Sequence, residues 1–116
     1  PPAWLFGPVW TTLYLFIATS AYRLVTKGQS QFLGLALGLW CLQMTANTLW
    51  TPVFFGAFDL EGALYLSCIL WFSISSYILV SFKIDRTAGY LFIPYWVWVS
   101  FATFLNYAYL NLNPAT

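Results

Sequence analysis

A row of polar and aromatic side chains runs through an apolar stretch near the middle of the chain. The row comprises Gln43, Asn47, Trp50 and Phe54, at steps of four, three and four residues. This spacing is that of one helix face. An amide that faces hydrocarbon is costly, so these side chains should face protein or a cavity. The row therefore predicts either hydrogen bonds between helices or one wall of a pocket.

Two other apolar stretches repeat this combination of aromatic rings with polar groups at helical spacing. The first contains Trp10, Tyr14, Ile17 and Ala21, and the second contains Tyr95, Trp98, Ala102, Asn106 and Tyr109. For any single amide, hydrogen bonding to a neighbouring helix is the simpler interpretation. Three amides in line with several tryptophans favour a pocket, because pockets pair an aromatic lining with few polar groups. We expect a cavity for a large, flat, apolar ligand.

The residues needed for most catalysis are missing from the apolar stretches. The chain contains no histidine, and Asp59, Glu61 and Asp85 are its only acidic residues. This composition predicts neither a nucleophile with its base nor a general acid. Cys41 and Cys68 are interpreted as small hydrophobic residues, and no metal site is expected. We predict no catalytic residue, and we expect no nucleic-acid partner.

Composition indicates what must position these side chains. Hydrophobic residues make up 61% of the 116-residue chain and charged residues 6%, whereas soluble domains contain about 25% charged residues. Residues 1–22, 28–58, 62–82 and 87–116 carry no charge. About 20 apolar residues cross a bilayer as a helix, and these stretches lack the alternation of barrel strands. The sequence predicts an all-α integral membrane bundle with four transmembrane helices.

Turn residues and prolines place the expected spans at residues 8–25, 32–55, 63–82 and 90–112. Pro8 is expected in the first turn of its helix and Pro52 in the last turn of the second. All four Lys and Arg residues lie in or beside the first and third turns, which are therefore expected on the cytoplasmic side. The segment "GLALG" at residues 34–38 permits close approach of another helix, within the bundle or in a dimer.

Three segments resemble the TspO/MBR family of tryptophan-rich sensory proteins and mitochondrial translocator proteins. They are "PPAWLFGPVWTTLY" (1–14), "NTLWTPVFFG" (47–56) and "PYWVWVSFATFLNYAYLNLN" (94–113). The resemblance implies a single domain over residues 1–116, which corresponds to helices two to five of a five-helix fold. It further implies that the family's first helix is missing from this chain. A homodimer is expected, since members of the family are usually dimeric.

The same resemblance implies the ligands and the site. Porphyrins such as protoporphyrin IX and haem are expected as ligands rather than cofactors, in a membrane receptor or transporter-like protein linked to tetrapyrrole transport or stress regulation. Light-dependent porphyrin degradation is the enzymatic alternative, and an aromatic scaffold is the structural one. The expected ligand-binding residues are Trp4, Trp10, Tyr14, Asn47, Trp50, Phe54, Ala102 and Asn106, with Trp98 added from the spacing.

Further ligands of the family are sterols and benzodiazepine-type drugs. In animal members the last helix carries a leucine, a tyrosine and then a basic residue. Leu105 and Tyr107 are present here, but Asn111 replaces the basic residue, which argues against sterol binding. The resemblance implies the cell membrane of a bacterium, or the mitochondrial outer membrane if the chain is eukaryotic.

Overall fold

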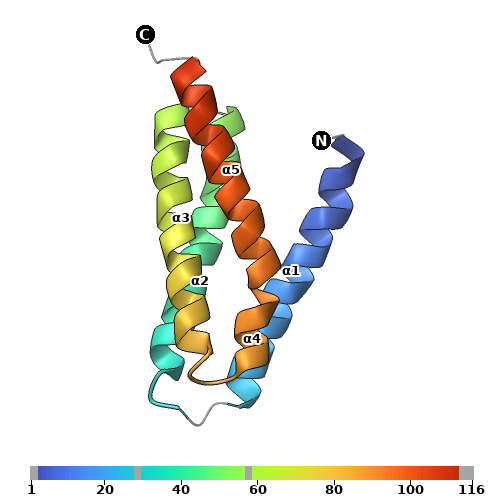
Figure 1. Ribbon diagram of the computed structural model, residues 1–116, viewed down its shortest axis with the longest axis vertical. Helices are drawn as coiled ribbons and strands as arrows, with labels where there is room; N and C mark the ends of the chain where they lie inside the picture. Colours follow the sequence, from blue (N-terminus) through green and yellow to red (C-terminus); the bar gives the residue numbers. More distant parts are fainter. Residues whose placement is uncertain (1–2, 28–29, 57–58, 113–116) are drawn as a thin grey trace.

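The computed structural model describes residues 3–27, 30–56 and 59–112, in which helices are joined by short turns. The side chains of residues 3, 5, 6, 51, 54 and 55 lie outside this description. Figure 1 shows long helices running alternately up and down the longest axis of the molecule. The helices are α1 (Ala3–Thr26), α2 (Leu33–Thr51), η1 (Pro52–Gly56), α3 (Leu60–Ser81), α4 (Arg86–Leu91) and α5 (Ile93–Leu112). The expected all-α bundle is confirmed.

Two of the expected helix boundaries are corrected by the structure. α1 begins at Ala3, so Pro8 lies inside the helix and not in its first turn. Proline in a helix removes the hydrogen bond that its own N–H would make. The carbonyl of Pro8 still accepts a hydrogen bond of 2.8 Å from the hydroxyl of Thr12. The fourth span begins at Arg86 and is interrupted at Phe92, between α4 and α5.

Pro52 marks a change of helix type at the end of α2. The α-helix ends at Thr51, and residues Pro52–Gly56 continue as a π-helical turn, η1. A proline cannot donate the backbone bond of a regular α-helix, and π-helical turns accommodate such interruptions. The expected position of Pro52 at the end of this span is confirmed, and the wider turn begins two residues after Trp50.

The buried core draws side chains from all the α-helices, α1 to α5, and within it a group of hydrogen bonds joins α1, α3 and α4. The hydroxyl of Ser20 donates to the carbonyl of Ala88 over 2.7 Å and lies 2.8 Å from the hydroxyl of Tyr77. Ser20 has a single hydroxyl proton, so Tyr77 is the donor in the second bond. Toward its N-terminus, α1 diverges from α5 (Figure 1). α1 is therefore fixed to the bundle mainly through its C-terminal half.

A reciprocal pair of tryptophan–serine bonds joins α3 to α5. The indole of Trp71 donates to Ser100 over 2.8 Å, and the indole of Trp96 donates to Ser75 over 2.9 Å. Each serine donates in turn to a carbonyl of the tryptophan on its own helix, Ser100 to Trp96 and Ser75 to Trp71. The two indoles and the two serine hydroxyls therefore all have hydrogen-bond partners. This is important in hydrocarbon, because no water is present there to replace a missing partner.

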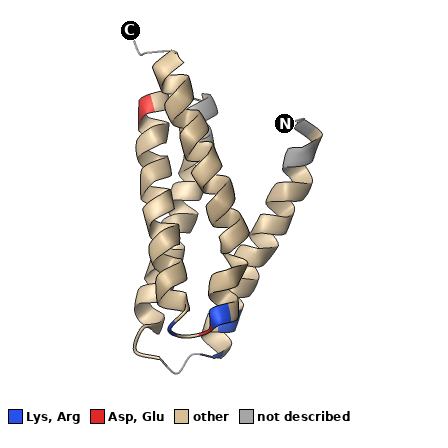
Figure 2. Cartoon of the chain, in the orientation of Figure 1, with Lys and Arg blue, Asp and Glu red and all other residues tan. Residues whose placement is uncertain are grey.

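The charged residues are segregated to the two ends of the bundle. Figure 2 shows the Lys and Arg residues at the end with the α1–α2 and α3–α4 connections. Asp85 lies at this end as well, paired with Arg23, whereas Asp59 and Glu61 lie at the opposite end, at the start of α3. Two described segments, Leu60–Ser81 and Arg86–Leu112, combine the length and mean hydropathy (1.8 and 1.4) of membrane spans. α1 and α2 have 24 and 19 residues, which is also long enough to cross a bilayer.

Candidate functional site

A chain of hydrogen bonds links α1, α2 and α5 in the interior. The hydroxyl of Tyr14 donates to the Asn47 carbonyl oxygen over 3.0 Å, and the Asn47 amide donates to the hydroxyl of Tyr95 over 2.6 Å. The hydroxyl of Tyr95 then donates to the carbonyl oxygen of Gln43 over 2.8 Å. We call Tyr14, Asn47, Tyr95 and Gln43 the polar chain. Its bonds hold three helices together at one level.

The helical spacing of α2 explains how one helix supplies half of the polar chain. Gln43 and Asn47 are one helical turn apart, so both point from the same face of α2. Both side chains are buried, in agreement with the expectation that amides avoid hydrocarbon. For Asn47 the interpretation as a helix-to-helix bond is confirmed, because its partners Tyr14 and Tyr95 belong to α1 and α5.

Aromatic rings surround the outer end of the polar chain. The ring of Trp10 lies 5.4 Å from that of Tyr14, 6.5 Å from that of Tyr95 and 6.2 Å from that of Trp98, measured between centroids. The contacts with Tyr95 and Trp98 are edge-to-face, a geometry that aromatic quadrupoles favour. We call Trp10, Tyr14, Tyr95 and Trp98 the aromatic cluster. Together with the polar chain it forms an uncharged site of rings and amides.

The remaining predicted residues lie outside this cluster. The side-chain amide of Asn106 is buried and donates to the backbone carbonyl of Leu60 over 3.0 Å. Its side-chain oxygen has no partner within the described segments. Trp50 and Ala102 are partly buried. Trp4 is 73% exposed near the start of α1, and the side chain of Phe54 lies outside the described residues.

Sequence reasoning placed Trp10, Tyr14, Asn47 and Trp98 in the site, and the structure brings them together. It left Gln43 and Tyr95 out of the ligand-binding set. Their signal was present, because both belong to the helical rows that carry the amides and tryptophans. What the rows did not indicate is that the hydroxyl of Tyr95 lies between the two amides.

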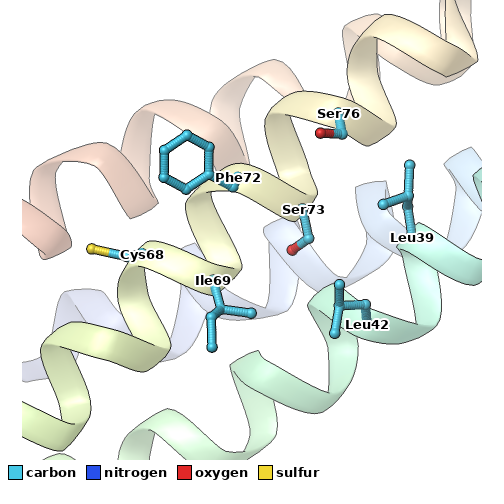
Figure 3. A pocket seen from close by; sticks show the side chains of 7 residues that line it. All are labelled: Leu39, Leu42, Cys68, Ile69, Phe72, Ser73 and Ser76. Atoms are coloured by element: carbon cyan, nitrogen blue, oxygen red, sulfur yellow. The ribbon is translucent and has the colours of Figure 1, made fainter.

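A separate groove of about 360 Å³ lies on the outer side of the bundle where α2 meets α3 (Figure 3). It is open rather than enclosed, and no charged residue lines it. None of the residues predicted for ligand binding takes part in it. The lining consists of Leu39, Leu42, Cys68, Ile69, Phe72, Ser73 and Ser76. In a membrane such an open apolar groove faces lipid, so it is distinct from the interior site.

Comparison with known proteins finds relatives that match nearly the whole chain. The family model of the TspO/MBR family matches residues 1–112. Protein CrtK of Rhodobacter capsulatus is 39% identical over 98% of this chain and 72% of its own length. The tryptophan-rich sensory protein of Cereibacter sphaeroides is 38% identical over 97% and 70%. The human translocator protein is 36% identical over 92% and 64%.

Proposed function

The chain belongs to the TspO/MBR family, and on this premise we propose that it binds porphyrins as a membrane receptor or transporter-like protein. The family membership supports a receptor- or transporter-like role in a membrane, and the interior site suggests the kind of ligand. Protoporphyrin IX and haem are the porphyrins that we expect to bind. The aromatic cluster beside the polar chain is the observation that carries the proposal.

The chemistry of the aromatic cluster suits a flat macrocycle. Trp10 and Trp98 contribute two large rings set edge to face, and each ring contact with a ligand contributes on the order of 1 kcal/mol beyond its buried area. Asn47 and Tyr14 supply polar atoms at the edge of the cluster. A site with a few polar groups within an aromatic lining orients an apolar ligand without a charged partner.

A titration with protoporphyrin IX tests the proposal. The full-length protein is titrated in lipid nanodiscs, and binding is followed by the shift of the porphyrin's Soret absorption band. Trp10→Ala combined with Trp98→Ala removes two ring contacts, so we expect the Kd to rise about tenfold or more. The absorption of the porphyrin itself is the signal, so the loss of protein tryptophans does not alter the readout.

Phe104→Ala provides the control, because Phe104 is an exposed aromatic residue of α5 that lies outside both the aromatic cluster and the groove between α2 and α3. Its Kd for protoporphyrin IX should equal that of the unmodified protein. If the double variant and the control bind equally well, the ligand lies elsewhere. If the unmodified protein shows no saturable Soret shift, the proposed function itself is wrong.

We also propose that two copies of the chain associate through the "GLALG" face of α2. Gly34 and Gly38 are exposed, and a methyl group built on either would meet no other atom within 4 Å. These glycines therefore do not bring together helices within the described chain. Small residues that face outward allow another transmembrane helix to approach closely, and a second copy of α2 has the matching surface.

A further inference from the structure

The polar chain runs from the edge of the interior to its centre. The side chain of Tyr14 is 40% exposed, that of Asn47 is nearly buried, and Tyr95 and Gln43 have no exposed surface. Every bond in the chain is donated in the same direction, from Tyr14 inward to Gln43. Tyr14 is therefore the member of the chain that a ligand reaches, and Gln43 is the inner end.

The direction in which the hydrogen bonds of the polar chain are donated can be reversed without a change in the shape of the side chains. Rotating a carboxamide by half a turn exchanges its oxygen and nitrogen, which occupy nearly the same volume. After both amides rotate, Gln43 donates to Tyr95, Tyr95 donates to Asn47, and Asn47 donates to Tyr14. The number of hydrogen bonds stays the same. The hydroxyl proton of Tyr14, which points at Asn47 in the present direction, is then released outward.

The two directions also leave comparable groups unsatisfied. In the present direction the side-chain nitrogen of Gln43 is buried and has no partner among the described residues. In the reversed direction the oxygen of Gln43 takes that place. An unpartnered buried carbonyl is tolerated at least as well as an unpartnered buried N–H. The reversal therefore exchanges one unsatisfied group for another, and the free energies of the two directions lie close together.

From this arrangement we propose that the hydroxyl of Tyr14 forms a hydrogen bond with the polar edge of the ligand. Reversal of the polar chain lets this hydroxyl either accept or donate that hydrogen bond. In the present direction the Tyr14 oxygen accepts from a ligand N–H, and in the reversed direction Tyr14 donates to a ligand carbonyl or ring nitrogen. The site then takes uncharged flat aromatic ligands of both kinds. This inference rests on the proposed function, because it assumes that the ligand lies against the aromatic cluster.

Three tricyclic aromatic compounds of nearly equal size and shape test the proposal. Carbazole offers only an N–H donor, acridine offers only a ring-nitrogen acceptor at mildly alkaline pH, and anthracene offers neither. Each competes with protoporphyrin IX for the full-length protein in nanodiscs, and its affinity is corrected for partition into protein-free nanodiscs. One net hydrogen bond corresponds to about a 2- to 10-fold gain in affinity. Carbazole and acridine should therefore both bind more tightly than anthracene.

Variants of the inner end distinguish a reversible chain from a fixed one. Gln43→Met removes the acceptor of the Tyr95 hydroxyl proton, and this proton then finds an acceptor only when Tyr95 donates to Asn47. The chain is thereby held in the reversed direction, with Tyr14 as an outward donor. Acridine should still bind more tightly than anthracene, whereas carbazole should bind no more tightly than anthracene. If Gln43 had a purely structural role, its replacement would instead weaken the binding of all three compounds alike.

Further variants keep the proposal testable if Gln43→Met is too unstable to purify. Tyr14→Phe removes the hydroxyl that the ligand reaches, so carbazole and acridine should then bind no more tightly than anthracene. Tyr95→Phe uncouples Asn47 from Gln43, so Tyr14 and Asn47 can pair in either direction and both compounds should still bind more tightly than anthracene. Thr45→Val is the matched control, because Thr45 is exposed on α2 and its hydroxyl bonds the carbonyl of Cys41. It should change nothing.

The outcomes separate the inference from the proposed function. If protoporphyrin IX binds but Tyr14→Phe leaves the preferences for carbazole and acridine intact, the inference is wrong and the proposed function stands. Equal loss of both preferences in Gln43→Met also overturns it, as does loss of both in Tyr95→Phe. If protoporphyrin IX does not bind at all, both proposals fail together.

Discussion

At the scale of single residues, one ion pair fastens α1 to the α3–α4 turn. The Arg23 guanidinium donates to the carboxylate of Asp85 over 2.7 Å. This hydrogen bond, against a smaller opposing effect of burial, lowers the pKa of the Asp85 carboxyl below its ordinary value of 3.8. Replacing Asp85→Asn should lower the Tm in detergent at neutral pH by less than about 5 °C, because ion pairs near a surface contribute little.

The lowered pKa of Asp85 fixes the pH range in which this effect is present. A carboxyl whose pKa is lower in the folded state stabilises the fold above its unfolded pKa, and the contribution is lost as the pH falls through the folded pKa. The Tm difference between the unmodified protein and Asp85→Asn should be constant above about pH 5 and shrink below about pH 4. Glu61→Gln is the control, since no cation lies in an ion pair with Glu61 among the described residues. A difference that persists unchanged in acid would contradict this assignment.

Residue spacing predicted part of the interior site and missed part of it. A helical row shows which side chains share a face, so it correctly turned Gln43 and Asn47 inward. It does not show the height at which two helices cross, and this height decides which tyrosine meets which amide. The bonds from Asn47 to Tyr14 and Tyr95 depend on the placement of α1 and α5 relative to α2. That placement comes from packing across the whole bundle.

At the scale of secondary-structure elements, α4 approaches α3 through a glycine. Gly89 is buried, and a methyl group built on it would overlap the ring of Phe82. Gly89→Ala should therefore destabilise the fold by about 1–3 kcal/mol through overpacking, partly offset by the higher helix propensity of alanine. Thermal unfolding followed by tryptophan fluorescence measures the loss.

Gly38→Ala is the matched control for Gly89→Ala. Gly38 lies inside α2, and a methyl group built on it meets no atom of another helix within 4 Å. Alanine is still small enough for close contact between membrane helices. Both substitutions bring the same gain in helix propensity, so the difference between their Tm values isolates the contact with Phe82. Equal Tm values for the two variants would show that the Phe82 ring or α4 moves aside without cost, and would contradict the expected overpacking.

The elements themselves were predictable to the extent that hydropathy determines them. Stretches without charge are visible in the sequence, and the positions of Lys and Arg correctly paired the two turns that share one end of the bundle. A single proline changes the mean hydropathy of a 20-residue stretch very little. The sequence therefore did not show that Pro8 lies within α1, or that α4 and α5 are separate helices near Pro94. These details depend on local hydrogen bonds rather than on burial.

At the scale of the whole molecule, the outward glycines of α2 predict its state of association. Gly34 is exposed, and a methyl group built there meets no atom of another helix within 4 Å, so we expect its own chain to accommodate a leucine at this position. It would, however, hold a second α2 helix apart, since close approach requires small side chains at the contact. Gly34→Leu should therefore convert a dimer into a monomer while leaving the Tm of the fold nearly unchanged.

Light scattering corrected for bound detergent gives the protein mass that tests the dimer. Ala18→Leu is the matched control, because Ala18 is exposed on α1 and the substitution places the same leucine side chain on another outward face. The control should remain a dimer at protein concentrations at which Gly34→Leu is a monomer. If both variants keep the mass of two chains, the copies associate through a different face of the bundle. In that case the glycines of α2 serve contact with lipid rather than with a partner chain.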